Sequence, residues 1–186
     1  SGSGKTSLLR CIAGLEENAI ATIRFKNDLW QSHDHFLPTH ERRIGLVFQR
    51  QNLFPHLSSR QNIEFAEKRV KSSFDNLNVD SVIDNLEIEH LLNKYPAQMS
   101  GGEQQLVALA RTLKSNPALL LMDEPLSSLD DPRKNRLLEI IKDLNKKHGL
   151  PILYVTHSVD EVLKIADHLL VIEDGKLSVN KPLMEA

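Results

Sequence analysis

Three short apolar runs, each ending at a polar residue, constrain the fold more than any other feature of this 186-residue chain. They are RIGLVFQ at 43–49, ALLLMDE at 118–124 and PILYVTH at 151–157. Continuous aliphatic and β-branched runs of this length are typical of strands buried on both faces, which is the pattern of a parallel sheet. Stretches with helical spacing separate the runs, so the sequence predicts an α/β layered core.

The clearest helix is predicted over 132–148. Asp131 can cap its start, Pro132 suits the first helical position, and Gly149 follows its end. Its buried face is expected to carry Leu137, Leu138, Ile141 and Leu144.

The middle of the chain differs from the flanks. Residues 50–99 carry little strand signal, and VDSVIDNLEIEHLLNKY at 79–95 has apolar residues at helical spacing, which predicts a helical insertion. The polar segment at 71–80 is expected to be a loop. Near the C-terminus, Asp174-Gly175 between two apolar runs predicts a hairpin.

Composition excludes several classes of protein. With 23 basic and 25 acidic residues the net charge is −2, which argues against a chain built to neutralise nucleic-acid phosphates. The single cysteine, Cys11, excludes an internal disulfide and a multi-cysteine zinc site, and fits a reducing compartment. No apolar run approaches the roughly 20 residues that span a bilayer, so membrane association is expected only through a partner.

The opening SGSGKTSLLR contains the closing half of a phosphate-binding pattern. In GxxxxGK(S/T), glycines let backbone N–H groups close on phosphate oxygens, the lysine reaches the β and γ phosphates, and the hydroxyl ligates Mg²⁺. Gly4, Lys5 and Thr6 match the end of this pattern, whose first glycine is not in the chain. The alternative is a flexible polar segment running into a helix.

The strand LLLMD ends in two carboxylates, Asp123 and Glu124. An α/β sheet binds its ligands at the carboxyl ends of strands. Asp123 is therefore placed to support Mg²⁺, and Glu124 to orient a water against a γ-phosphate. A strand followed by a solvated acidic turn is the alternative.

In MSGGEQQLVALARTL, Ser100 and Glu103 form a capping box, and Gly101 and Gly102 allow close backbone approach. The helix that follows is expected to bury Leu106, Leu109, Ala110 and Leu113. The segment is either a well-capped helix alone or also an anion site.

Two further polar residues, Gln49 and His157, end the other apolar runs. Each can be an ordinary loop residue. Because the carboxyl ends of parallel strands meet at one edge of the sheet, however, their placement beside Asp123 and Glu124 predicts one shared site.

In this order, the motifs resemble those of the nucleotide-binding subunit of ABC transporters. Residues 100–102 look like the signature of that family, and LSSLD at 126–130 looks like the loop that follows its acidic pair. The resemblance covers nearly the whole chain. It implies a P-loop NTPase (RecA-like) α/β fold with a core over 1–50 and 116–186 and a helical subdomain with the signature over 51–115.

The resemblance implies ATP and Mg²⁺ as ligands, with Glu124 as the general base or water-orienting residue and His157 in contact with the γ-phosphate. The implied metal ligands are Thr6, Gln49 and Asp123. The implied nucleotide-binding residues are Ser1, Gly2, Ser3, Gly4, Lys5, Thr6, Ser7, Gln49, Ser100, Gly101, Gly102, Glu103 and Asp130.

The resemblance also implies partners. The signature of one subunit closes over ATP held by a second ATPase subunit, so the active unit is a dimer, with Asp130 at the subunit contact. An integral-membrane permease holds this dimer at the cytoplasmic face of the membrane, and no nucleic acid is expected. The loop QNLFPHLSSRQNI at 51–63 is the candidate permease-facing surface, with Phe54, Pro55 and Leu57 as apolar contacts; a buried loop is the alternative.

A narrower likeness is to importer ATPases for molybdate and related oxyanions. It rests on LPTHERRIGLVFQ, LFPHLSSRQNI and IEHLLNKYPAQMSGGE. Sulfate, iron or polyamine importers remain open as alternatives, as do an ABC ATPase of DNA repair or translation, a small-molecule P-loop kinase, and a remnant that binds nothing.

The chain departs from the family pattern at two residues and at its ends. Glu103 and Leu106 stand where the family mostly has glutamine and arginine. The strand before the loop, the first glycine and the adenine-stacking aromatic residue are expected upstream of Ser1, so we expect an N-terminally truncated chain. We expect the C-terminal regulatory domain that some oxyanion-importer ATPases carry to lie outside this chain as well.

Overall fold

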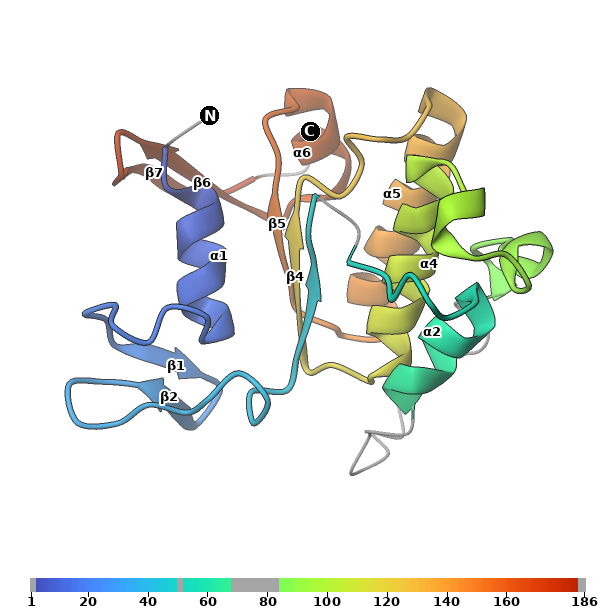
Figure 1. The fold of residues 1–186 in the computed structure, drawn as a ribbon. Helices are drawn as coiled ribbons and strands as arrows, with labels where there is room; N and C mark the ends of the chain where they lie inside the picture. Colours follow the sequence, from blue (N-terminus) through green and yellow to red (C-terminus); the bar gives the residue numbers. More distant parts are fainter. Residues whose placement is uncertain (1–2, 50–51, 68–83, 184–186) are drawn as a thin grey trace. The chain divides into compact units, whose positions relative to one another are not determined.

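The computed structural model describes residues 3–49, 52–67 and 84–183. Figure 1 shows their helices and strands, coloured along the sequence. They belong to two compact units, one formed by Ser1–Ile44 with Ala166–Ala186 and the other by Gly45–Ile165, and each unit is described by itself. Among these described residues, no helix combines the length and the apolar character that a membrane crossing requires.

The second unit is built on a three-stranded sheet in the order β3 (Ile44–Val47), β4 (Leu119–Asp123), β5 (Ile152–Val155). β4 and β5 pair in parallel, with Asp123 opposite Val155, and β3 runs in the same direction in Figure 1. Every residue of the central strand β4 is buried. The three strands predicted from the apolar runs are therefore confirmed, each within two residues of its predicted ends.

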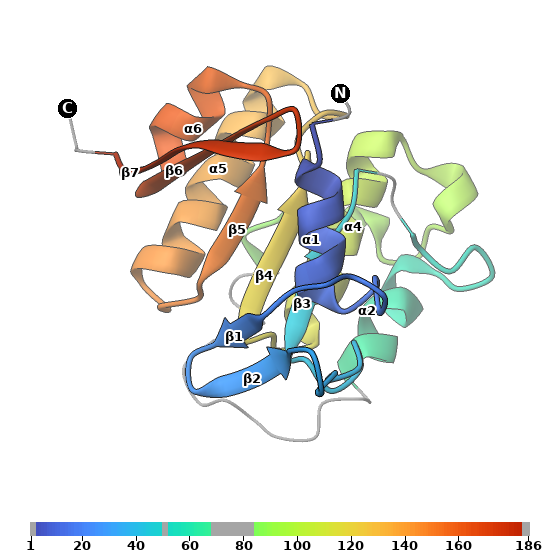
Figure 2. The same cartoon turned by 90° about the vertical axis from the view of Figure 1, so that its left-hand side faces the viewer.

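Helices α4 (Gly101–Lys114) and α5 (Asp131–Lys146) cover one face of this sheet (Figures 1 and 2). Helix α2 (Ser59–Glu67) packs against α4, and α6 (Val159–Ile165) against α5. The core of the unit includes the aliphatic residues Val107, Leu109, Leu113, Leu120, Met122, Leu137, Ile141 and Leu144. The predicted buried face of α5 is thus confirmed, whereas Leu106 on α4 is only half-buried.

The start of α5 differs from the prediction by one residue. Asp130 is the N-cap, and its Oδ1 accepts a hydrogen bond from Arg133 N at 3.0 Å. The backbone of Asp130 is extended, with φ −72° and ψ 163°, whereas Asp131 already belongs to the helix. Asp131 therefore lies in the first turn, where its negative charge interacts favourably with the positive end of the helix dipole.

In the described part of the stretch before the signature segment, residues 84–98, only Asp84 is α-helical, although the periodicity of 79–95 predicts a helix. Among residues 84–98 the structure has turns and two short 3₁₀ helices, η1 (Glu89–Leu91) and η2 (Pro96–Gln98). Glu87 has a positive φ of 52°, which ends any right-handed helix there. The loop expected at 71–80 lies outside the described residues.

The first unit contains α1 (Lys5–Ala13) and two antiparallel hairpins. One hairpin joins β1 (Ile23–Phe25) to β2 (Asp28–Gln31), and the other joins β6 (His168–Glu173) to β7 (Lys176–Pro182). At the second turn Asp174 and Gly175 have φ of 48° and 72°, the conformation of a two-residue type I′ turn. The predicted C-terminal hairpin is confirmed.

A buried arginine ties α1 to the rest of the first unit. Arg42 is 3% exposed, and its Nη1 donates to Cys11 O at 2.9 Å and to Ile12 O at 2.8 Å, at the C-terminal end of α1. Its Nε donates to Leu37 O at 2.7 Å and its Nη2 to Trp30 O at 3.2 Å. The arginine thus gives a donor to Ile12 O and a second donor to Cys11 O, which also accepts from Gly14 N at 3.0 Å.

We expect Arg42→Met to lower the free energy of unfolding by roughly 3 kcal/mol, because Ile12 O and Leu37 O would each lose a donor and an unpaired carbonyl away from water costs about 1–3 kcal/mol. Urea denaturation followed by the fluorescence of Trp30 measures this, since that tryptophan lies beside the arginine. Arg24→Met, on an exposed position of β1, is the matched control and should have little effect. Equal unfolding midpoints for the two variants would contradict the capping role.

Candidate functional site

The phosphate-loop residues lie at the start of α1. Gly4 is the N-cap with φ 95° and ψ 0°, a left-handed conformation that favours glycine. Lys5 is the first helical residue, and its Nζ donates to Ser3 Oγ at 2.5 Å. Glycine has no side chain to cap the first-turn amides, which is the condition under which a helix start binds an anion.

Around this turn, Thr6 and Ser7 are exposed. Both residues belong to the first turn of α1. Ser1 and Gly2, also predicted to bind nucleotide, lie outside the described residues.

Glu124 follows β4 in a constrained backbone conformation. Its φ is 46°, which is uncommon for a residue with a side chain. Its N–H donates to Val155 O at 2.9 Å, and its carbonyl accepts from Ser127 N at 3.3 Å and from Ser127 Oγ at 3.0 Å. Such backbone conformations persist where surrounding contacts hold them, and they gather at functional sites.

The Glu124 carboxylate brings together the polar residues that end the three strands. Gln49 Nε2 donates to its Oε2 at 3.3 Å, and His157 Nδ1 lies 3.2 Å from its Oε1 and donates in the tautomer that carries a proton there. The Glu124 side chain is 27% exposed and that of His157 76%. The sequence placed Gln49, Glu124 and His157 in one site, and the second unit has them in contact.

Asp123 is the last residue of β4 and is 7% exposed. Carboxylate, amide and hydroxyl oxygens, the groups that Asp123, Gln49 and Thr6 carry, are each ligands that Mg²⁺ accepts. The residue types therefore fit the cation that the motifs imply.

Two side chains close before His157 in the chain bind a carboxylate that sequence reasoning missed. Glu161 Oε2, in the first turn of α6, accepts from Tyr154 Oη at 2.8 Å and from Thr156 Oγ1 at 2.7 Å. Burial, together with this carboxylate, raises the pKa of Tyr154 well above its usual range, so its hydroxyl stays protonated and keeps donating. These bonds join the end of β5 and Thr156, the residue before His157, to the first turn of α6.

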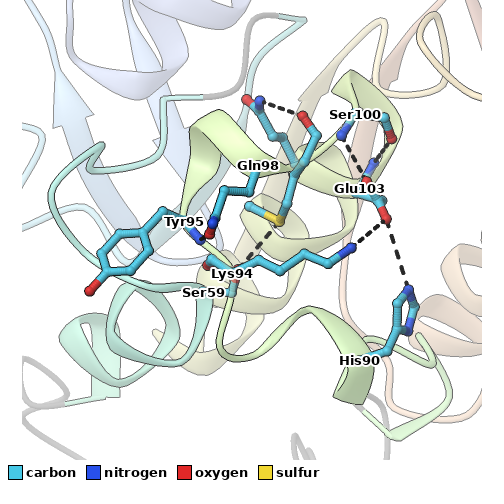
Figure 3. A network of polar contacts seen from close by, with 9 residues as sticks. Ser59, His90, Lys94, Tyr95, Gln98, Ser100 and Glu103 are labelled. Carbon is cyan, nitrogen blue, oxygen red and sulfur yellow. Dashed lines mark hydrogen bonds and ion pairs between the residues drawn. The ribbon is translucent and has the colours of Figure 1, made fainter.

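The signature segment starts α4 with the predicted capping box (Figure 3). Glu103 N donates to Ser100 Oγ at 3.2 Å, and Ser100 N donates to Glu103 Oε2 at 2.7 Å. The hydrogen bond from the Ser100 amide is the main cause that lowers the pKa of Glu103. The Ser100 hydroxyl and Lys94 lower this pKa further, and burial opposes the decrease with a smaller effect. Glu103 is therefore ionised at neutral pH.

The signature glycines lie against the LSSLD loop. A Cβ on Gly102 would come within 2.9 Å of Leu129 Cδ2 and 3.2 Å of Ser128 O, and a Cβ on Gly101 within 3.7 Å of Ser128 Cβ. Close backbone approach thus requires glycine at position 102. The signature glycines and the LSSLD loop are therefore in contact. The LSSLD loop ends at Asp130, the N-cap of α5.

The candidate permease-facing loop is organised by a buried amide. Asn62 is fully buried; its Oδ1 accepts from Phe54 N at 2.8 Å, and its Nδ2 donates to three loop carbonyls. The Phe54 ring lies 4.6 Å from the Phe65 ring and 5.3 Å from the guanidinium carbon of Arg111, and is half-buried like Leu57. Pro55 is exposed, so the loop has a solvent-facing apolar tip.

Known proteins share this combination of motifs. The family model described as "ABC transporter" matches residues 1–127. The molybdenum import ATP-binding protein ModC of Thiobacillus denitrificans is 49% identical over 183 residues, which cover 98% of this chain and 51% of that protein. ModC 1 of Azotobacter vinelandii is 46% identical over 187 residues, covering 100% and 52%. The chain thus spans about half the length of the curated relatives it matches.

Solved structures agree with the sequence comparison. A dimeric ATP-binding cassette in a post-hydrolysis state, bound to ADP and Pi, superposes with a TM-score of 0.84 at 28% identity, over 98% of this chain and 82% of that one. The predicted P-loop NTPase α/β fold is confirmed by this similarity. With its motifs in the family order and most of its length matched by the family model, the chain belongs to the ABC transporter family.

Proposed function

We propose that this chain binds and hydrolyses ATP and powers an ABC importer for molybdate or a related oxyanion. The observation that carries the proposal is the contact of the Glu124 carboxylate with both Gln49 and His157 at the ends of the parallel strands. Family membership supports ATP as the nucleotide, and the names of the relatives, molybdenum import ATP-binding proteins, support the cargo.

Each predicted residue has a chemical role in this proposal. Lys5 and the amides of the loop hold the phosphates, and Thr6, Gln49 and Asp123 would hold Mg²⁺, which when bound neutralises charge on the phosphate oxygens. Glu124 orients the attacking water and accepts its proton, and His157 donates a hydrogen bond toward the γ-phosphate. Positioning and charge stabilisation are the main contributions to phosphoryl transfer.

The proposal includes two kinds of partner. A second ATPase subunit supplies its signature residues, Ser100 to Glu103, to the ATP held by the first, with Asp130 at the contact. A permease binds the tip around Pro55 and holds the dimer at the cytoplasmic face of the membrane. Solved cassettes of the family that form dimers support the first partner, and the import function named for the relatives supports the second.

Phosphate release from MgATP by the intact protein, without any added acceptor, tests the central claim. A P-loop kinase would need a small-molecule acceptor, and a remnant that binds nothing would neither bind nor hydrolyse ATP. The cargo is tested by ATP-dependent uptake of molybdate, against sulfate, into vesicles that contain the protein with its permease. An ABC ATPase of DNA repair or translation would hydrolyse ATP but would not co-purify with a membrane subunit.

A further inference from the structure

Glu103 carries an additional interaction beyond its capping box. Its Oε1, the oxygen that does not bind the Ser100 amide, lies 3.4 Å from Lys94 Nζ and 3.9 Å from His90 Nε2 (Figure 3). The Glu103 side chain is 17% exposed and that of Lys94 39%. The two oxygens of one carboxylate are thus divided between a backbone amide and a lysine ammonium group.

The backbone of Lys94 is fixed where its side chain can reach Glu103. Its carbonyl accepts hydrogen bonds from Ser59 N at 2.9 Å and from Ser59 Oγ at 3.0 Å, which attach it to the start of α2. Its own N–H donates to Leu91 O at 2.8 Å, at the end of η1. Lys94 is therefore held from two sides.

Other cations near Glu103 have carboxylate partners of their own. Arg133 and Arg136 line a cavity of about 270 Å³ together with Glu103 and His90. Arg133 pairs with Asp130 at 3.6 Å, and Arg136 pairs with Glu87. Lys94 makes the shortest cationic contact with Glu103 among the described residues.

We propose that Lys94 is a positioning residue that neutralises and orients Glu103, so that a signature segment with glutamate can close over the triphosphate of ATP. This inference rests on the proposed function. An unpaired carboxylate in the signature would repel phosphate charge, whereas glutamine at that position carries none. With one oxygen on Ser100 N and its charge offset by Lys94, Glu103 can still accept a hydrogen bond from a ribose hydroxyl.

The test compares ATPase kinetics of the intact protein with those of Lys94→Met, Lys94→Arg, Glu103→Gln and the double variant Lys94→Met/Glu103→Gln. We expect Lys94→Met to raise KM for ATP by about two- to fivefold, the effect of losing a partly exposed ion pair, with a smaller change in kcat. Lys94→Arg should restore KM, and the Lys94→Met effect should vanish when residue 103 is glutamine. By NMR titration, Lys94→Met should raise the pKa of Glu103.

Lys147→Met is the matched control, because it breaks an exposed lysine–carboxylate pair with Asp143 on α5 and should leave KM unchanged. If the wild-type protein is active and Lys94→Met leaves KM unchanged, the inference fails while the proposed function stands. The inference also fails if Lys94→Met raises KM equally in the wild-type protein and in the Glu103→Gln variant. A wild-type protein without ATPase activity would overturn the proposed function, and the inference with it.

Discussion

Replacing Glu124 with glutamine should lower kcat for ATP hydrolysis by roughly 10²- to 10⁴-fold, the range that a positioned general base contributes. The amide cannot accept a proton from water, yet it has nearly the shape of the carboxylate. Its oxygen and nitrogen can still bond to Gln49 and His157, which contact the two carboxylate oxygens at 3.3 and 3.2 Å. ATP affinity should therefore change little.

Two measurements on the intact protein test this prediction: the rate of ATP hydrolysis in a single turnover, and the affinity for ATP at equilibrium. Glu139→Gln makes the same chemical change on an exposed position of α5 and serves as the control, with wild-type rates expected. Wild-type turnover by Glu124→Gln would show that this carboxylate does not handle the water, and the mechanism would need another base.

The strands and the hairpin near the C-terminus were predictable because each has a strong local cause. A strand buried on both faces, such as β4, requires an unbroken apolar run, and the Asp174-Gly175 pair supplies the positive φ that a type I′ turn needs. The capping box at Ser100 and Glu103 is equally local, since its residues are three positions apart.

Features that depend on distant contacts were not predictable. The charge of Arg42 gives no sign that its partners are carbonyls of residues up to 31 positions away, and an isolated arginine is usually exposed. The hairpin of β1 and β2 turns at Lys26, which has a φ of 53° without being glycine or asparagine. Between residues 84 and 95, Leu86 is buried from a turn and Leu91 from the 3₁₀ helix η1 that Ile88 precedes, so their spacing does not mark one face of an α-helix.

In the candidate site, too, some residues could be predicted from the sequence and others could not. Gln49, Glu124 and His157 could be assigned together because strand ends of a parallel sheet share an edge. Glu161 and Lys94 could not, because only their hydrogen bonds to other side chains in the folded protein single them out. Motifs and strand ends therefore predict candidate ligand-binding residues more readily than they predict the residues that contact those candidates.

Replacing Lys5 with methionine should weaken ATP binding by about 10- to 100-fold, since a hydrogen bond to a charged group contributes about 1.5–3 kcal/mol. The lysine is the first residue of α1, follows the left-handed Gly4 and donates to Ser3 Oγ at 2.5 Å, so its ammonium group lies beside Ser3. Methionine keeps the length and the helix propensity of the side chain, so α1 should still form.

Equilibrium titration with MgATP measures the effect, and Lys176→Met, at an exposed position that begins β7, is the control for the loss of one positive charge. Unchanged affinity would remove Lys5 from the phosphate cradle. The Lys5 and Glu124 variants should fail differently, because one loses binding and the other loses the chemical step after binding. A protein in which both variants lost only binding would hold nucleotide at this loop without the carboxylate-assisted hydrolysis that the contacts of Glu124 imply.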